Sequence, residues 1–230
     1  MTISKQYQKN ILLELMNLNE YQKHADKQYI SNSNQSIKIK SNSIISPNDA
    51  QTIEDLQNFL NNTFNKNNKL NVNLIEGNQK SKILFMYGKC GVNDNKILDG
   101  EPGQLFDKML EGIKINRDKI ALCSYIPRGL EEIKENDSFI QTMQIINYRI
   151  IELLNPKFLI ILSNFCIKML LATDLSSMSL RGKWFDFNTP NDITPKKCRV
   201  LYEPLMLINN PELKKEAWED LKEISRQLGG

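Results

Sequence analysis

Short, nearly continuous apolar runs recur along the chain, and they have the length and composition of strands that are buried on both faces. They occupy residues 82–87, 119–125, 157–163 and 198–202. Before them, residues 70–74 alternate apolar and polar side chains, which predicts a half-exposed edge strand. The pattern therefore indicates a sheet whose central strands are parallel and covered on both sides.

Apolar residues at helical spacing predict helices around these strands. The expected helices cover residues 4–29, 52–64, 104–113, 137–155, 164–172 and 210–230. Thr52, with Asp55 three residues later, forms an N-capping pattern, and Pro211 suits the first turn of the last helix. Because strands alternate with helices, we predict an α/β fold with three α/β/α layers, a central, mostly parallel, four-stranded sheet and an additional N-terminal helix.

The same pattern divides the chain into three segments. Residues 1–30 form a helical N-terminal segment, residues 31–50 are rich in Ser and Asn and predict a linker, and residues 51–230 form the α/β domain. We expect the chemistry to lie in the domain.

Composition and charge exclude several classes of protein. Among the 230 residues, 40% are hydrophobic and 25% are charged, which allows a packed core. The net charge of +3 permits nucleic-acid binding through a local patch without requiring it. No run is long and apolar enough to span a bilayer, and the N-terminal segment is too polar for a signal peptide. We expect a cytoplasmic monomer without a membrane partner.

Histidine and cysteine usage narrows the chemistry further. The one histidine is His24, which excludes a Ser-His-Asp triad and a multi-histidine metal site from the domain. The cysteines are widely spaced and form no C-x-x-C pair, which argues against a disulfide framework and favours a reducing compartment. They are Cys90, Cys123, Cys166 and Cys198.

Ligands of such sheets bind beyond the carboxyl ends of the strands. The residues that directly follow the predicted strands are therefore the candidate site. The expected substrate-pocket residues are Gly88, Lys89, Cys90, Gly91, Ser124 and Asn164. At the end of the last strand stands Glu203, the candidate catalytic residue.

Three stretches carry a resemblance to a known family: "LEGIKINRDKIALCSYIP", "LLNPKFLIILSNFCIKMLLATDLSSMSLRGKWFDF" and "LYEPLMLINNPELKKEAWEDL". They resemble the bacterial and thermophile uracil-DNA glycosylases that usually carry an iron–sulfur cluster. That family has "PK" before its third strand, "LRGRW" after the next helix and "HPAYLLRNPALKREAWEDL" at the end. The likeness runs from about Thr52 to the C-terminus, and it implies the glycosylase fold, DNA as partner and a role in base-excision repair.

At the site itself the chain departs from the family pattern. The acid that places water falls on Gly88, the asparagine that reads the uracil edge falls on Ser124, and the histidine that donates to the uracil carbonyl falls on Glu203. The loop that supplies a stacking phenylalanine is shorter, with Leu98 as the nearest apolar substitute. An ionised glutamate would repel the charge that develops on uracil, and it donates only when protonated.

The resemblance also raises the question of the cluster. The family's cysteine pair before the first strand would fall near residues 65–71, which contain no cysteine. We therefore predict that the iron–sulfur cluster is absent and that the protein holds no metal or other cofactor. Cys90, with Lys89 beside it, is either a reactive thiol or, like the other cysteines, a small buried side chain.

Several residues suit DNA contacts, each with a structural alternative. Lys89 could bind a phosphate or be a solvated loop residue. The segment 204–207 could enter the minor groove when a base is flipped, or pack under the last helix. The candidate DNA-binding residues are Arg128, Arg181, Lys183, Pro204, Leu205, Met206 and Leu207.

Three functions remain open on the sequence. The first is a DNA glycosylase with an altered site, and the second is a catalytically silent relative that binds DNA or, through its N-terminal segment, a repair protein. The third is a fold retained for another ligand. Glu203 is a repurposed acid or base in the first and a drifted position in the second. In either case we expect little or no excision of uracil.

Overall fold

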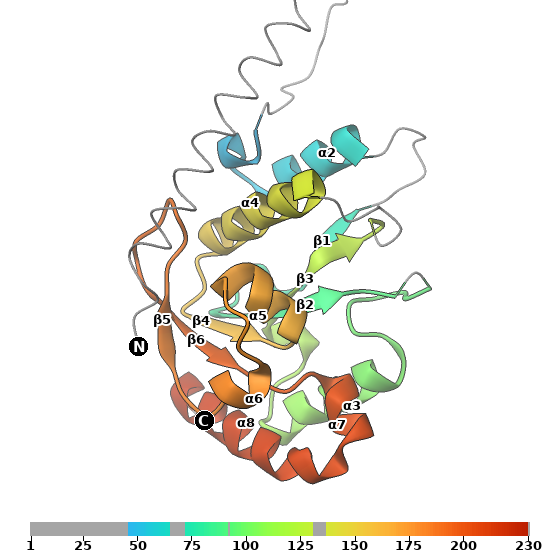
Figure 1. Ribbon diagram of the computed structural model, residues 1–230, viewed down its shortest axis with the longest axis vertical. Helices are drawn as coiled ribbons and strands as arrows, with labels where there is room; N and C mark the ends of the chain where they lie inside the picture. The colour runs from blue at the N-terminus through green and yellow to red at the C-terminus, as the bar shows by residue number, and fades with distance from the viewer. Residues whose placement is uncertain (1–45, 65–71, 92, 131–136, 230) are drawn as a thin grey trace, which may run out of the picture. The chain divides into compact units, whose positions relative to one another are not determined.

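The fold is that of a computed structural model, in which residues 46–64, 72–91, 93–130 and 137–229 are described (Figure 1). The predicted N-terminal helix and most of the predicted linker lie outside these residues. The last part of that linker forms a short 3₁₀ turn, Pro47–Asp49. Arg149 holds it against the domain by donating two hydrogen bonds to the Ala50 carbonyl, at 2.9 and 2.6 Å.

A six-stranded sheet forms the middle of the domain, in the order β1-β3-β2-β4-β6-β5. The strands are β1 (Asn73–Gly77), β2 (Ile83–Lys89), β3 (Ala121–Arg128), β4 (Phe158–Ile161), β5 (Phe185–Phe187) and β6 (Lys196–Val200). The four central strands are parallel, and β1 and β5 pair antiparallel at the edges.

The prediction of a mostly parallel sheet is confirmed, but the prediction of four strands is wrong. The four apolar runs are the four parallel strands, and the edge strand β1 joins the same sheet. The second edge, β5, has the sequence "FDF", which is too short and too polar to stand out as an apolar run. Edge strands are covered less completely, so their sequences carry a weaker signal.

Seven α-helices occur in the described residues. They are α2 (Ile53–Phe64), α3 (Gly100–Gly112), α4 (Asp137–Leu154), α5 (Asn164–Leu171), α6 (Ser177–Leu180), α7 (Pro204–Asn209) and α8 (Lys214–Leu228). The sequence pattern did not predict α6 and α7. These are the two shortest helices, and a helix of one or two turns is too short to show a helical stripe of apolar residues. Short 3₁₀ turns, Arg117–Lys119 and Pro211–Leu213, precede β3 and α8.

The helix termini follow the capping signals in the sequence. At the start of α2 the Thr52 hydroxyl accepts a hydrogen bond from the Asp55 amide at 3.1 Å, and the Asp55 carboxylate accepts one from the Thr52 amide at 2.9 Å. At the end of α8, Gly229 adopts a left-handed conformation with φ of 89°.

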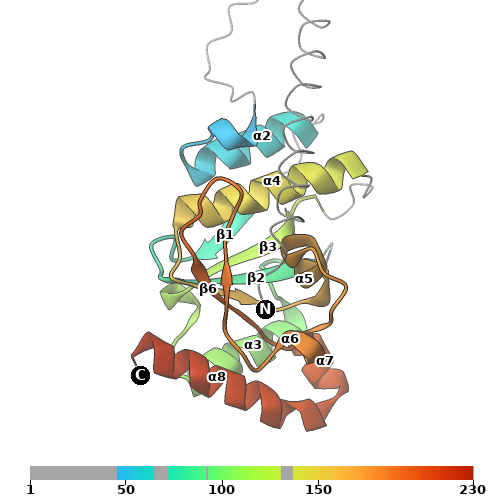
Figure 2. The same ribbon diagram turned by 60° about the vertical axis from the view of Figure 1, so that its left-hand side comes forward.

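Helices cover both faces of the sheet, as Figures 1 and 2 show. The helices α2, α4 and α5 contribute to the core on one face, and α3, α7 and α8 to the core on the other. Along β2 the side chains alternate, so Leu84 and Met86 enter the first core and Ile83 and Phe85 the second. The predicted three α/β/α layers are therefore confirmed.

The order in which strands are added changes direction at β2. From β2 the chain passes through α3 to β3 on one side, and from β3 through α4 to β4 on the other side of β2. Because α3 and α5 lie on opposite faces, the segments that leave the carboxyl ends of β2 and β4 diverge. Ligands of open α/β sheets bind at such a switch point.

Candidate functional site

The carboxyl ends of β2 and β3 bring the first predicted pocket residues together. Tyr87 pairs in register with Ser124, and Lys89 pairs with Ile126. The Cys90 thiol lies 3.6 Å from the Ser124 hydroxyl, and both side chains are buried. We expected these residues to follow the strands, but Gly88, Lys89 and Ser124 lie within them because the backbone pairing continues past the apolar runs.

Gly88 lies at the switch point itself, against the start of α5. A Cβ atom at this position would lie 2.8 Å from the Ser163 hydroxyl and 3.5 Å from the Phe165 Cβ. That hydroxyl is already engaged, since it accepts a hydrogen bond from the Cys166 amide at 3.1 Å and so caps α5. The position therefore has no room for a side chain unless the cap moves.

Glu203 follows β6 and lies at the N-terminus of α7, where its side chain makes no capping hydrogen bond. The Tyr87 hydroxyl donates a hydrogen bond to its carboxylate. Burial raises the pKa of Glu203, and the hydrogen bond from Tyr87 opposes that shift. Burial and the negative charge of Glu203 raise the pKa of Tyr87, so its phenol stays protonated. The ends of β2 and β6 thus form one acid–phenol pair.

Glu203 also differs from the other buried and half-buried carboxylates of the described residues, because each of those binds a cation or a backbone amide. In the part of the chain that the structure describes, no Lys or Arg forms an ion pair with it. The negative charge is half-buried and is compensated by a neutral hydroxyl alone. Since such a charge is costly to desolvate, the site favours a ligand that supplies a donor or a positive charge.

Two of the remaining candidate pocket residues, Gly91 and Asn164, form hydrogen bonds with nearby segments of the chain. The Gly91 amide donates to the Asp94 carboxylate at 2.6 Å, which closes a tight turn after β2. The Asn164 side chain is exposed to solvent, and its oxygen accepts a hydrogen bond from the Ser177 amide at 2.8 Å. Leu98, the nearest substitute for a stacking phenylalanine, is buried with φ of 55°, so it is not available to stack on a base.

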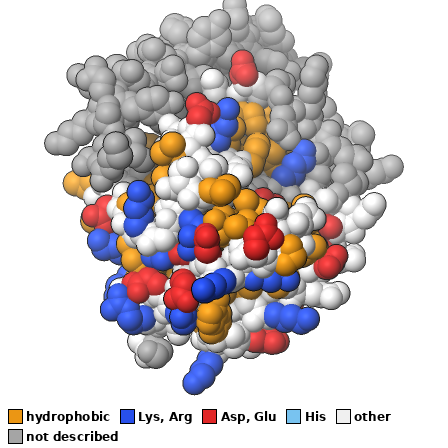
Figure 3. Space-filling view, turned by 60° about the horizontal axis from the view of Figure 1, so that its bottom comes forward, with side chains coloured by type: hydrophobic (Ala, Val, Ile, Leu, Met, Phe, Trp, Pro, Cys, Tyr) orange, Lys and Arg blue, Asp and Glu red, His pale blue; other side chains and the backbone are white. Residues whose placement is uncertain are grey.

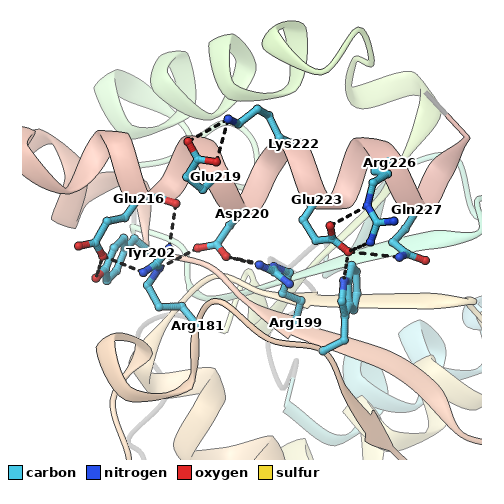
Figure 4. Close-up of polar contacts among 11 residues, drawn as sticks. Arg181, Arg199, Tyr202, Glu216, Glu219, Asp220, Lys222, Glu223, Arg226 and Gln227 are labelled. Atoms are coloured by element: carbon cyan, nitrogen blue, oxygen red, sulfur yellow. Dashed lines mark hydrogen bonds and ion pairs between the residues drawn. The ribbon is translucent and has the colours of Figure 1, made fainter.

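Both arginines that the sequence predicts to contact DNA, Arg128 and Arg181, bind other groups of the domain. Arg181 binds the Asp220 carboxylate at 2.7 Å and the Glu216 carboxylate at 2.8 Å (Figure 4). Arg128 donates to the Asn95 carbonyl in the segment after β2. Both residues therefore hold parts of the fold together, which accounts for their presence without DNA.

Lys183 and Lys89 are exposed, as expected of phosphate ligands. Figure 3 shows the face that α3, α7 and α8 form, where basic and acidic side chains are interspersed. This face carries no uniform positive field, so a basic surface as such does not identify a DNA-binding side there.

The segment 204–207 forms the first part of α7 and has two faces. Pro204 and Leu207 are buried, and Leu207 packs in the core beside α3 and α8. Leu205 is 46% exposed, and Met206 is partly buried. Only Leu205 and Met206 can therefore reach a partner, and the packing alternative holds for the other two.

The described residues do not fit an iron–sulfur cluster. All four cysteines are buried and none forms a disulfide, and no group of three potential metal ligands converges in the described ranges. Cys166 donates to the Tyr87 carbonyl at 2.9 Å, while burial raises the pKa of its thiol to about 12. A thiol that is protonated and hydrogen-bonded to the backbone is a poor ligand, because metals bind the thiolate.

Sequence reasoning placed Ser163 at the end of the third buried strand without giving it a role, and it did not include Tyr87 among the pocket residues. Tyr87 was read as the last apolar residue of a buried strand, although its hydroxyl needed a partner at that position. Ser163 precedes a helical stripe and so carried a capping signal. Neither signal reveals that these side chains meet Glu203 and Gly88, which are distant in the sequence.

The structure shows an α/β/α domain, and the candidate site lies at the carboxyl ends of its parallel strands, where sheets of this kind bind ligands. The model of the uracil DNA glycosylase superfamily matches residues 76–222, and the chain belongs to this superfamily. The matched range spans β2 to β6 and the first part of α8, so it includes every strand end described above. No curated protein matches the chain.

Membership implies a DNA glycosylase-like role with DNA as the partner. Of the helices in the described ranges, none has the length and apolar character that a membrane span requires.

Proposed function

We propose that the protein binds DNA through the ends of β2, β3 and β6, and that it excises uracil at most very weakly. The observation that carries the proposal is the pairing of Glu203 with Tyr87 at the position where the resemblance places a histidine. A half-buried carboxylate stands where a neutral donor would stabilise the departing base.

The electrostatics of uracil excision support this proposal. Uracil leaves with negative charge on its oxygens, and an ionised Glu203 repels that charge. Loss of one positioned donor costs ~10²–10³ in rate. Loss of the group that positions or activates water costs a further ~10²–10⁴. Gly88 has no carboxylate, and the Ser163 hydroxyl occupies the space in which one would begin.

A second function, excision of a different base, is favoured by the raised pKa of Glu203. A carboxyl group that is protonated more readily than usual can donate a proton to a leaving base. In that function Glu203 is the catalytic acid, and Tyr87 holds its carboxyl group in place.

The DNA contacts that we propose are the accessible ones: Lys89, Lys183, Leu205 and Met206. The lysines suit phosphates and the apolar pair suits an unstacked base step. Arg181 and Leu207 are not included, because the first is ion-paired and the second is buried.

The test is an excision assay on matched single- and double-stranded oligonucleotides with one uracil, together with binding to undamaged DNA. We expect binding that weakens as salt rises, and no excision above the background. Lys183→Ala should weaken binding, whereas Lys222→Ala, which removes an exposed lysine paired with Glu219 on α8, should leave it unchanged. Rapid uracil release that Glu203→Gln abolishes would show that the site is catalytic.

A further inference from the structure

Among the described residues, the buried and half-buried carboxylates are compensated by a cation or by a backbone amide, with the exception of Glu203. Asp220 binds two arginines, Glu152 binds Arg149 at 3.1 Å, and Asp192 binds Lys196 at 2.9 Å. Among the described residues Glu203 has the Tyr87 hydroxyl instead. A cation that belongs to a ligand would complete the pattern seen elsewhere in the fold.

The partner of Glu203 adds an aromatic surface to this charge. Tyr87 is half-buried, so part of its side chain remains accessible beside the carboxylate. An aromatic face next to a carboxylate is a combination that recognises organic cations, because ring quadrupole and negative charge attract the same group.

The hydrogen-bonding groups of the site also favour a ligand that donates hydrogen bonds. A carboxylate only accepts hydrogen bonds when it is ionised, whereas uracil presents carbonyl oxygens that require donors. Ser124, in the position that reads the base edge, is 1% exposed and its hydroxyl is close to the Cys90 thiol. The half-buried carboxylate of Glu203 is thus matched to a base that donates hydrogen bonds.

We propose that Tyr87 and Glu203 bind a positively charged nucleobase, the chemical class that alkylation of a ring nitrogen produces in DNA. This inference rests on the proposed DNA-binding function and names its preferred ligand. The carboxylate accepts from the amino group and attracts the ring charge, while the Tyr87 ring lies against the base. Neutral pyrimidines lack the charge and are bound less tightly.

The experiment compares four single-stranded oligonucleotides of one sequence that carry 3-methylcytosine, cytosine, thymine or uracil at a central position. 3-Methylcytosine is the probe because it is cationic at neutral pH and has an exocyclic nitrogen donor. Fluorescence anisotropy with the full chain should show roughly tenfold tighter binding of the 3-methylcytosine strand than of the other three.

Variants assign this preference to the two residues. Glu203→Gln should remove most of the preference, measured as the ratio of the dissociation constants of the cytosine and 3-methylcytosine strands. Tyr87→Leu should reduce the preference, whereas Tyr87→Phe keeps the ring and should retain the larger part of it. Glu212→Gln, at an exposed position outside the site, is the matched control. Circular dichroism and thermal unfolding establish that each variant is folded.

The outcomes separate this inference from the function on which it rests. Equal binding of all four strands by the unaltered protein overturns the inference and leaves the proposed DNA binding intact. A preference that Glu203→Gln retains also overturns it, because the charge would then have another source. Failure to bind any of the strands overturns the inference and the proposed function together.

Discussion

Two clusters of charge in the same domain are built in opposite ways. Between β6 and α8, Asp220 is completely buried and bonds to Arg181 and Arg199, while Glu216 bonds to Arg181 and Tyr202 (Figure 4). At the ends of β2 and β6, Glu203 is half-buried and has the phenol of Tyr87 as its partner. The first cluster balances its charges internally, and the second leaves one negative charge without a cation.

The comparison distinguishes the charges of the Asp220 cluster, which stabilise the fold, from the charge of Glu203, which we propose is available to a ligand. The Asp220 cluster links residues 39 and 21 positions apart and fastens α8 to the sheet, and Arg181 and Arg199 also lie over the rings of Tyr202 and Trp184. The pair of Glu203 and Tyr87 makes fewer contacts between segments than the Asp220 cluster does. It lies at the strand ends, where sheets of this kind bind ligands. Removal of charge should therefore have opposite consequences at the two places.

The largest effect is expected from Asp220→Asn. This change leaves Arg199, whose side chain is 5% exposed, without its carboxylate and Arg181, 17% exposed, with Glu216 alone, so the free energy of unfolding should fall by about 3–5 kcal/mol. Urea unfolding followed by circular dichroism measures the difference. Glu219→Gln on the exposed side of α8 is the control, since it removes a surface pair with Lys222 and should change stability by less than about 1 kcal/mol. Equal effects of the two variants would refute the structural role of the Asp220 cluster.

A smaller effect on the free energy of unfolding is expected at Gly88, which lies between the candidate site and the start of α5. Gly88→Ala places a Cβ 2.8 Å from the Ser163 hydroxyl, and the displaced hydroxyl no longer caps α5, so the variant should lose about 1–3 kcal/mol of stability. In a Ser163→Ala background, which has already lost the cap, the same change should cost less. A double-mutant cycle measures this coupling. Additive effects would mean that the two side chains do not compete for space.

The smallest effect, with the opposite sign, is expected from Glu203→Gln. Removal of the uncompensated charge should leave stability at pH 7 unchanged or raise it by up to about 1 kcal/mol. The carboxyl has a pKa raised above its ordinary value of 4.5, so its stabilising contribution is complete at low pH and is lost as pH rises through the folded pKa.

The advantage of the Gln variant should therefore be greatest near pH 7 and disappear near about pH 4. Urea titrations across that range measure it. Asp192 behaves in the reverse way, because Lys196 lowers its pKa to about 2, and its contribution is lost as pH falls from about 4 towards 2. A Glu203→Gln variant that is markedly less stable at pH 7 would place Glu203 with the structural charges and would break the comparison.

The local elements could be predicted because they depend on short stretches of sequence. The apolar runs located the four parallel strands, Thr52 and Asp55 located the start of α2, and the family motifs located the strand ends. The edge strand β5 and the short helices α6 and α7 escaped prediction, since a few residues show neither alternation nor a helical stripe.

What the sequence determined by itself is the fold class, the superfamily and the position of Glu203 just after the last parallel strand. The tertiary structure decided which charges are paired: Arg181 is joined to Asp220, the space beside Gly88 is taken by Ser163, and Glu203 is left with Tyr87. A pattern along the chain records which side chains face the core, whereas an ion pair depends on the distance between segments far apart in the sequence. That distance is set only when the layers pack, which is why an arginine that suited a phosphate proved to be part of the scaffold.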